Sequence, residues 1–250
     1  MKEERADELA LEVLQKSELF GELDENATEE FIAECGFVSW KKGESIDHQL
    51  GQKYLYIILD GRLKITQIDP STGRSITLFL LSNGDVYDIF TLLDGEEHVS
   101  FPVTLDKVLA LCISLDKARQ WLCTHPELNK RFLPYLGRLM RHLEDFSQSL
   151  VFESTLTRLS KLILKHAQPK KAYENHYPVE LIHNLSHEAL AEMIGSVRSV
   201  VSSQMHKLKE EEIILSRRGH LAIKNLEKLI QKSDQFEACI FQEKNKKNKG

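Results

Sequence analysis

Several features that mark other classes of protein are missing from this chain of 250 residues. Apolar runs are short, such as "YLYIIL" at 54–59, whereas a membrane-spanning helix needs about 20 apolar residues. The N-terminal stretch "MKEERADELALEVLQ" is charged and amphipathic, without an apolar signal region or a cleavage site. The four cysteines (Cys35, Cys112, Cys123 and Cys239) lie far apart and form no CxxC. These absences predict a cytoplasmic protein that has no membrane contact and no disulfide framework.

Motifs of the common enzyme classes are absent as well. The sequence contains no GxxxxGK[ST] phosphate-binding loop, no GxSxG and no HExxH. Its β-rich region holds only His48 and His98, which are far apart. It therefore lacks the His-x-His set, with a later Glu and a further His, that metal-dependent β-barrel catalysts need. We expect neither enzymatic activity nor a metal centre.

The net charge of −5 hides an uneven distribution. Residues 1–153 carry 16 Lys and Arg against 27 Asp and Glu, a balance of −11, whereas residues 154–250 carry 17 against 11, a balance of +6. Four of the positive charges come from the tail "KNKKNK" at 244–249. A basic module joined to an acidic one is typical of a phosphate-backbone binder with a separate sensing domain.

Hydrophobic periodicity divides the chain into helical and β-rich regions. Apolar residues three and four apart predict helices within residues 4–35. From Trp40 onward, short β-rich runs alternate with turns that contain glycine. These runs are "YLYIIL", "RLKITQI", "SITLFLL", "VYDIFTLL", "SFPVTL" and "VLALCIS". They predict an antiparallel sandwich or roll of about eight strands, after which the helical period returns at Leu115.

A long helix is expected after the roll. Its apolar residues follow at spacings of 4-3-4-3-4, the a/d seam of a coiled coil, and they are Phe132, Leu136, Leu139, Leu143, Phe146 and Leu150. This stripe is narrower than the apolar face of an ordinary globular helix, so it favours a homodimer. Leu133 and Met140 widen the stripe in part, which leaves packing within one subunit as the alternative. Pro134 is expected to kink or restart the helix, because it removes one backbone hydrogen bond.

After a second helix over 153–167 and a loop over 168–178, the sequence predicts two helices joined by a tight turn. Ser186 is a good N-cap for a helix over 187–194, and Gly195 can end it in the left-handed conformation. A following helix over 197–210 would bury Val201, Met205 and Leu208 and expose a small polar face made of Arg198, Ser199, Ser202, Ser203 and His206. This arrangement describes a helix-turn-helix with a recognition helix.

Two short strands, "IIL" and "LAI", flank the turn "SRRGH". They predict a hairpin wing whose tip carries Arg217 and Arg218, two cations that can lie on phosphates. Together with the positive balance of this half of the chain, the helix pair and the wing predict binding to double-stranded DNA.

In order and spacing, residues 12–226 resemble the Crp/Fnr family of bacterial transcription regulators. The matching features are "KKGE", "YLYIILDGRLKI", "NGDVYDIFTLLDGEE", "HPELNKRFL", the heptad helix, Phe152 and "LSHEALAEMIGSVRSVVSSQMHKL". The resemblance implies an α+β fold with an N-terminal double-stranded β-helix (jelly roll) sensor, a long dimerisation helix and a C-terminal winged helix-turn-helix that reads a palindromic operator. The expected regions are the sensor with its N-terminal helices (1–123), the dimerisation helix (124–152), the winged domain (153–226) and a C-terminal helix with a basic tail (227–250).

The resemblance also implies roles for residues of the helix pair. Arg198 occupies the place of the arginine that donates to a guanine edge, and Ser186, with His187 beside it, lies where family members hold a phosphate. Ser199 stands in place of a frequent glutamate, and Ser203 in place of a frequent second arginine. Because a cytosine acceptor and a second donor are lost, we expect an operator that differs from the best-known half-sites of the family.

Family members that bind cyclic nucleotides use a glutamate for the ribose and an arginine with a hydroxyl for the phosphate. Aligned on "LLDGE", these positions become Ile89, His98 and Val99, which with Tyr87 form the effector pocket that we expect. A neutral imidazole is a poor substitute for the bidentate arginine. We therefore expect no binding of cAMP or cGMP.

Other members of the family bind iron–sulfur clusters or haem. Iron–sulfur members need several closely spaced N-terminal cysteines, and only Cys35 lies there, so no such cluster is expected. Haem stays open, with His98, His48, Cys112 or His142 as axial ligands. A redox role of Cys112 or Cys123, another small molecule, or no ligand at all are the remaining alternatives.

One further class is a protein-interaction module with a degenerate winged domain, which would lack salt-dependent affinity for DNA. The acidic face of the roll could also contact RNA polymerase.

Overall fold

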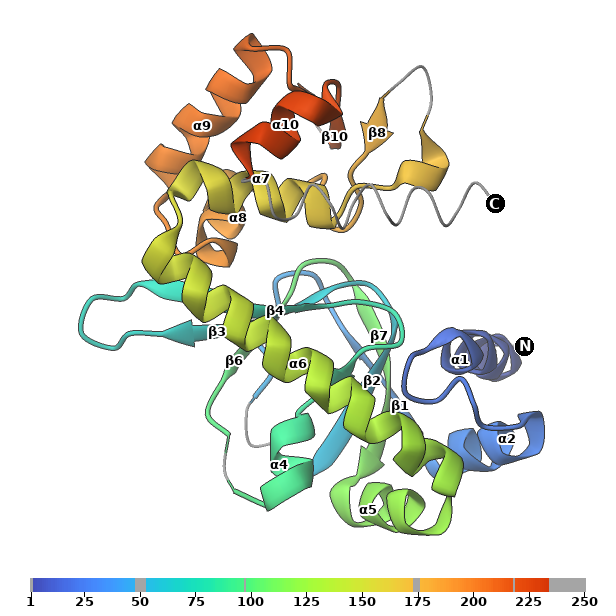
Figure 1. The fold of residues 1–250 in the computed structure, drawn as a ribbon. Coiled ribbons are helices and arrows are strands. Elements are labelled where there is room, and N and C mark those ends of the chain that lie inside the picture. Colours follow the sequence, from blue (N-terminus) through green and yellow to red (C-terminus); the bar gives the residue numbers. More distant parts are fainter. Residues whose placement is uncertain (1, 48–52, 97, 173–175, 218, 234–250) are drawn as a thin grey trace. The chain divides into compact units, whose positions relative to one another are not determined.

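The computed structural model describes residues 2–47, 53–96, 98–172, 176–217 and 219–233. The chain forms two compact units (Figure 1). The first comprises Met1–Arg74 and Leu78–Glu144, and the second comprises Ser75–Thr77 and Asp145–Gly250. None of the helices in the described ranges combines the length and the hydropathy that a bilayer crossing requires.

Two helices precede the first strand, as the periodicity predicted. They are α1 (Lys2–Lys16) and α2 (Glu25–Glu34). The side chain of Asp24 caps the start of α2. Phe20 and Phe31 are almost fully buried, with their ring centroids 5.0 Å apart. Ala10 and Leu14 of α1 lie in the same core as Phe31 of α2, so both helices contribute to it.

An antiparallel roll of two sheets forms the body of the first unit, which confirms the predicted fold class. Four strands pair in the order β1-β7-β2-β5, and three pair in the order β4-β3-β6. They are β1 (Gly36–Trp40), β2 (Tyr54–Asp60), β3 (Leu63–Ile68), β4 (Ser75–Leu81), β5 (Val86–Tyr87), β6 (Phe101–Thr104) and β7 (Val108–Ser114). In the described part of the chain, the roll thus has seven strands where about eight were expected.

The central strands of the four-stranded sheet, β2 and β7, are largely buried on both faces. In β2, Leu55 and Ile57 belong to one apolar cluster, whereas Tyr56 and Ile58 belong to the other. The first cluster also takes in residues of α1, α2, α5 (Leu115–Thr124) and the first turns of α6 (Pro126–Phe152). Burial on both sides explains why "YLYIIL" is continuously apolar instead of alternating.

The strand predicted over "VYDIFTLL" is wrong in its second half. β5 ends at Tyr87, and a short helix, α4 (Ile89–Asp94), follows. Asp88 between them has a left-handed φ of 69°, which breaks the strand, and its carboxylate accepts a hydrogen bond from the Thr91 hydroxyl at 3.0 Å. An apolar run alone does not distinguish a strand from one buried turn of helix.

The long helix α6 continues through Pro134. Of the two predicted outcomes, a kink or a restart, the helix therefore does not restart at this proline. Proline removes only one backbone hydrogen bond, and Phe132 and Tyr135 on either side of it are buried in the core of the first unit. Packing of these neighbours in the core stabilises the helix where Pro134 lacks a backbone hydrogen bond.

The second unit contains the predicted helix-turn-helix and wing. Its elements are α7 (Thr155–Lys165), η1 (Pro169–Lys171), β8 (Tyr177–Pro178), α8 (His187–Met193), α9 (Arg198–Glu210), β9 (Ile214–Arg217), β10 (His220–Ile223) and α10 (Leu226–Lys232). The loop predicted over 168–178 instead contains a 3₁₀ turn and β8, which pairs with β10 to give a three-stranded sheet in the order β8-β10-β9. A strand of two residues is too short to show any alternation, so periodicity could not reveal it.

Candidate functional site

The helix pair begins with the cap that the sequence predicted. The hydroxyl of Ser186 accepts a hydrogen bond from the backbone N–H of Ala189 at 3.1 Å and so starts α8. Leu190 and Met193 on its inner face are buried. Gly195 follows with a φ of +59°, a conformation that residues with a Cβ rarely adopt. Local side-chain chemistry thus sets the tight turn that precedes α9.

α9 presents the polar face that was predicted for a recognition helix. Val201, Met205 and Leu208 are buried on its inner side. The outward residues are exposed, and they are Arg198, Ser199, Ser202, Ser203 and His206. His206 Nε2 lies 3.1 Å from a carboxylate oxygen of Glu210, one turn further along the same face. Arg198 is the first residue of the helix, where the dipole adds positive potential to its own charge.

The wing is a hairpin in which Arg217 pairs with His220. Gly219 has a φ of +75°, which allows the reversal of the chain. Arg217 is exposed at the end of β9. The second predicted tip residue, Arg218, lies outside the described residues.

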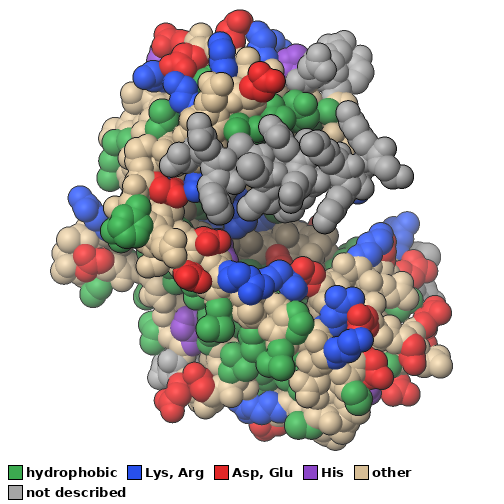
Figure 2. Space-filling model, viewed as in Figure 1, with side chains coloured by type: hydrophobic (Ala, Val, Ile, Leu, Met, Phe, Trp, Pro, Cys, Tyr) green, Lys and Arg blue, Asp and Glu red, His purple; other side chains and the backbone are tan. Residues whose placement is uncertain are grey.

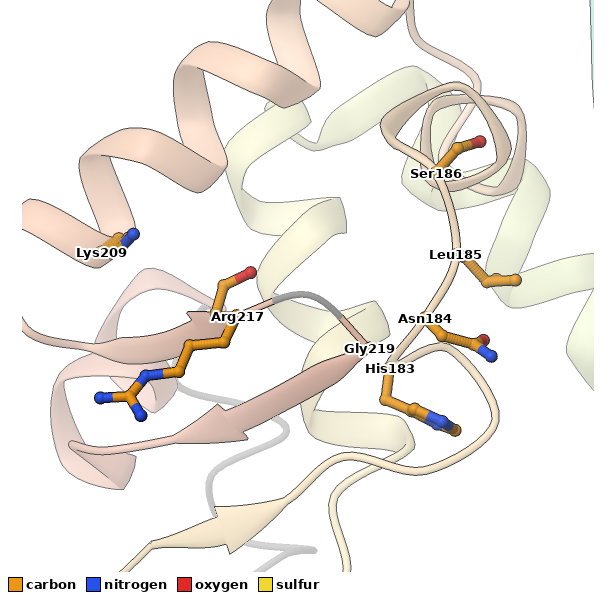
Figure 3. A pocket seen from close by; sticks show the side chains of 8 residues that line it. His183, Asn184, Leu185, Ser186, Lys209, Arg217 and Gly219 are labelled. Atoms are coloured by element: carbon orange, nitrogen blue, oxygen red, sulfur yellow. The ribbon is translucent and has the colours of Figure 1, made fainter.

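An open cleft of about 720 Å³ joins three segments of the second unit. It is lined by His183, Asn184, Leu185, Ser186, Lys209, Ser216, Arg217 and Gly219. Figure 3 shows Lys209 and Arg217 on one side of the cleft and Ser186 and His183 across from them. The sequence prediction missed Lys209, His183 and Asn184, because residues of three separate segments form no local pattern. The two cations on one side of the cleft, Lys209 and Arg217, are side chains that can contact phosphates.

The first half of the predicted dimer seam is occupied within the subunit. Phe132 is 7% exposed and belongs to the core of the first unit, and Leu136 and Leu139 pack against the same core. Leu143 and Phe146 are half-buried, and Leu150 is 36% exposed. The six residues therefore do not form one free stripe, because the helix uses part of it to cover its own roll.

A neighbouring stripe of α6 is more exposed. Leu133 is 68% exposed, Met140 is 70% exposed and Val151 is 72% exposed. Together with Gly137, Glu144 and Ser147 they repeat the spacing 4-3-4-3-4. Figure 2 shows hydrophobic side chains gathered on the face that α6 crosses. Three of these six positions thus expose large apolar side chains to solvent.

Three of the four predicted effector-pocket residues surround a small cavity in the first unit. Tyr87, Ile89 and His98 line it, whereas Val99 is 51% exposed and does not. The other lining residues are Ile65, Phe79, Leu81, Val86, Asp88, Phe90 and Leu139. The cavity measures about 20 Å³, which is room for about one water molecule. This volume is far below the roughly 300–1,000 Å³ that ligand pockets usually hold.

The polar wall of this cavity is a histidine–carboxylate pair. His98 Nδ1 lies 3.6 Å from Oδ1 of Asp88, whose side chain is 2% exposed. The ring of Phe90 meets the His98 ring edge-on, with centroids 5.0 Å apart. A buried carboxylate repels a phosphate, so this wall does not suit an anionic ligand.

The remaining candidate haem ligands and the cysteines that the structure describes do not line this cavity. His142 donates from Nε2 to the carbonyl of Leu78 at 3.0 Å, and His48 lies outside the described residues. Burial raises the pKa of Cys35 to about 12 and also raises the pKa of Cys112, so both are protonated thiols near neutral pH and react slowly. Cys123 is exposed. In the described ranges, no three His, Cys, Asp or Glu residues gather as a metal site would require.

Comparisons with known proteins agree with both units. Residues 37–125 match the family model of the cyclic nucleotide-binding domain, and residues 157–232 match that of the Crp-like helix-turn-helix domain. The global nitrogen regulator of Nostoc sp. is 28% identical over 163 residues, which cover 64% of this chain and 72% of the relative. The cyclic AMP receptor protein of Thermus thermophilus is 24% identical over 177 residues, which cover 70% and 77%.

Solved structures share the fold. A CooA mutant from Carboxydothermus hydrogenoformans superimposes with a TM-score of 0.69 at 18% identity, over 82% of this chain and 90% of that one. FixK2 from Bradyrhizobium japonicum gives a TM-score of 0.67 at 16% identity, over 80% and 98%. Members of the family that these comparisons identify are transcription regulators and not enzymes. A β-roll followed by a long helix and a winged helix-turn-helix, matched in both domains, means that the chain belongs to the Crp/Fnr family of DNA-binding transcription regulators.

Proposed function

We propose that the protein acts as a homodimer that reads a palindromic operator with its two copies of α9. The observation that carries this proposal is the exposed polar face of α9, which begins with Arg198. The opposite face of the same helix is apolar and buried. Two such helices related by a twofold axis can enter successive major grooves about 34 Å apart. The test is selection of binding sites from random duplexes, which is expected to return an inverted repeat.

Direct readout would come from the outward residues of α9. The guanidinium of Arg198 can donate two hydrogen bonds to O6 and N7 of guanine. Ser199 and Ser203 carry short hydroxyls, which can bond to several bases and discriminate less than charged or bidentate side chains. We therefore propose that α9 selects strongly for one guanine in each half-site and only weakly for the neighbouring bases. Such a half-site would differ from the family's best-known half-sites.

Backbone contacts would come from the cleft between α8, α9 and the wing. Lys209 and Arg217 line it together with Ser186, and both cations suit a phosphate of the strand that passes over the wing. Such contacts position the duplex without reading its sequence. They would hold the operator while α9 reads the groove.

Substitution of Lys209 by alanine is expected to weaken binding to all duplexes alike. Each phosphate contact contributes roughly 0.9 to the slope of log K against log salt, so a dimer that loses two contacts should lose about 2 from that slope. Fluorescence anisotropy across a salt series measures it. Lys228→Ala is the matched control, because Lys228 is an exposed lysine of α10 that does not line the cleft. An unchanged slope for Lys209→Ala would remove the cleft from the interface.

The proposed signal is not a cyclic nucleotide. The small cavity and the buried Asp88 beside His98 support this. A ligand shifts the balance between DNA-competent and incompetent states only through its different affinity for the two. The side chains that line the cavity would favour a small, mostly apolar ligand without negative charge.

Calorimetric titration of the protein with cAMP is expected to give no measurable binding heat, because no arginine faces the cavity and a carboxylate does. The same titration of the Thermus thermophilus cyclic AMP receptor protein serves as the positive control. Micromolar affinity in this chain would show that the pocket opens and recruits a cation from elsewhere, against the proposal.

A further inference from the structure

Arg158, near the start of α7, makes four hydrogen bonds to backbone carbonyls in the second unit. Its Nε donates to Ile194 at 2.7 Å, and its Nη2 donates to Gly195 at 3.4 Å. Its Nη1 donates to Glu153 at 2.8 Å and to Ser149 at 3.3 Å. One guanidinium thus joins two places in the chain, the last turn of α6 with the residue that follows it and the end of α8.

Both places are C-terminal ends of helices. The last carbonyls of a helix have no partner within it and carry the negative end of the helix dipole. A planar guanidinium with five donors can serve two such ends at once, which a lysine ammonium cannot do in the same geometry. Arg158 therefore fixes the end of α8 against the end of α6.

Gly195 brings the same two segments into direct contact. A Cβ atom added to Gly195 would lie 2.4 Å from Cδ2 of Leu150 in α6, so no larger residue fits without a shift. Gly195 is also three residues before Arg198, the first residue of α9. The turn that aims the recognition helix therefore rests on the last turns of α6.

We propose that Arg158 is a positioning residue that transmits the orientation of the C-terminal turns of α6 to the first turn of α9. This inference rests on the proposed function, since it concerns how Arg198 is aimed at the operator. When the end of α6 rotates or shifts, the carbonyls of Ser149 and Glu153 move with it. Arg158 carries that displacement to residues 194–195 and so to Arg198.

A matched control lies on the same helix. Lys161 forms an ion pair with the side chain of Glu153 at 2.6 Å and is also partly buried. Lys161→Gln removes a comparable cation of α7 and leaves the guanidinium of Arg158 in place.

The experiment compares wild type, Arg158→Gln, Arg158→Lys and Lys161→Gln as full-length protein. Anisotropy measures affinity for the selected operator and for a random duplex. Arg158→Gln is expected to lose roughly tenfold in operator affinity, within the usual range of coupling between sites, while its random-duplex affinity changes by less than about twofold, because the phosphate contacts remain. Arg158→Lys should recover part of the loss, and Lys161→Gln should behave as wild type.

Hydrogen exchange supplies a second readout. Amides of residues 195–201 should exchange faster in Arg158→Gln than in Lys161→Gln, while amides in the rest of the second unit stay protected. An Arg158→Gln protein with the operator preference of wild type would overturn the inference. Equal losses of affinity for both duplexes, with a general loss of amide protection, would also overturn it, since they indicate a purely structural role. A folded Arg158→Lys protein with wild-type operator preference and wild-type hydrogen exchange would do the same. If wild type itself shows no operator preference, the proposed function fails instead.

Discussion

Replacement of Arg198 by alanine is expected to remove most of the operator preference while leaving the protein folded and dimeric. A bidentate arginine–guanine pair contributes about 1–3 kcal/mol of discrimination, and a palindrome uses it twice. The dimer should therefore lose about 2–6 kcal/mol, or roughly thirtyfold to twenty-thousandfold in operator affinity. Arg198 is exposed at the start of α9, so its truncation removes no core packing.

Anisotropy with the selected operator and a random duplex measures this loss. Lys228→Ala is the control here as well, because it removes an exposed cation that lies on α10 and not on the outward face of α9. Arg198→Lys should keep the affinity for the random duplex and recover little of the operator preference, since a single ammonium cannot reproduce the guanidinium fork. Retention of the full preference by Arg198→Ala would mean that another residue reads the guanine.

Replacement of both Leu133 and Met140 by aspartate is expected to turn the dimer into a monomer. These side chains are 68% and 70% exposed in the single chain. Covering a side chain of this size contributes about 1.5–3 kcal/mol, so the four in a dimer account for about 6–12 kcal/mol at most. Added charges on a helix that faces its own copy increase the loss. Sedimentation velocity measures the change in mass, and operator binding should fall with it.

The same measurement on Leu143→Asp with Phe146→Asp decides between the two faces of α6. These residues belong to the seam that the heptad spacing predicted, and both are half-buried in the structure. If this pair of substitutions abolishes the dimer while the Leu133 and Met140 variant stays dimeric, the exposed stripe is not the interface. Circular dichroism separates dissociation from unfolding in either variant.

The helix-turn-helix could be predicted from the sequence because its signals are local. Ser186 caps α8, Gly195 permits the left-handed turn, and the buried positions of α9 follow helical spacing. Each signal needs only neighbours within a few residues. The resemblance to a known family then supplied what local chemistry cannot, namely the order of the domains.

What the sequence could not predict depends on contacts between distant segments. α6 carries apolar residues on two faces, and their spacing alone did not indicate which face packs against the β-roll of the same subunit. Phe132 packs in the core, while Leu133 next to it remains in solvent. The cleft with Lys209 and Arg217 likewise forms only when three segments meet. Asp88 shows the same limit, since its left-handed conformation cannot be recognised in a residue that is not glycine.

The pairing of β8 with β10 has a consequence for how such a regulator can be recombined. β8 precedes the helix pair and β10 follows it. Strand pairing therefore joins the two segments that flank the DNA-reading helices. A chimaera joined at residue 179 would leave the flank of β10 bare and open to pairing with other chains. A donor fragment that also keeps the carbonyl anchors of Arg158 must begin at or before Ser149, which makes a point within α6, and not the loop after it, the workable place for a graft.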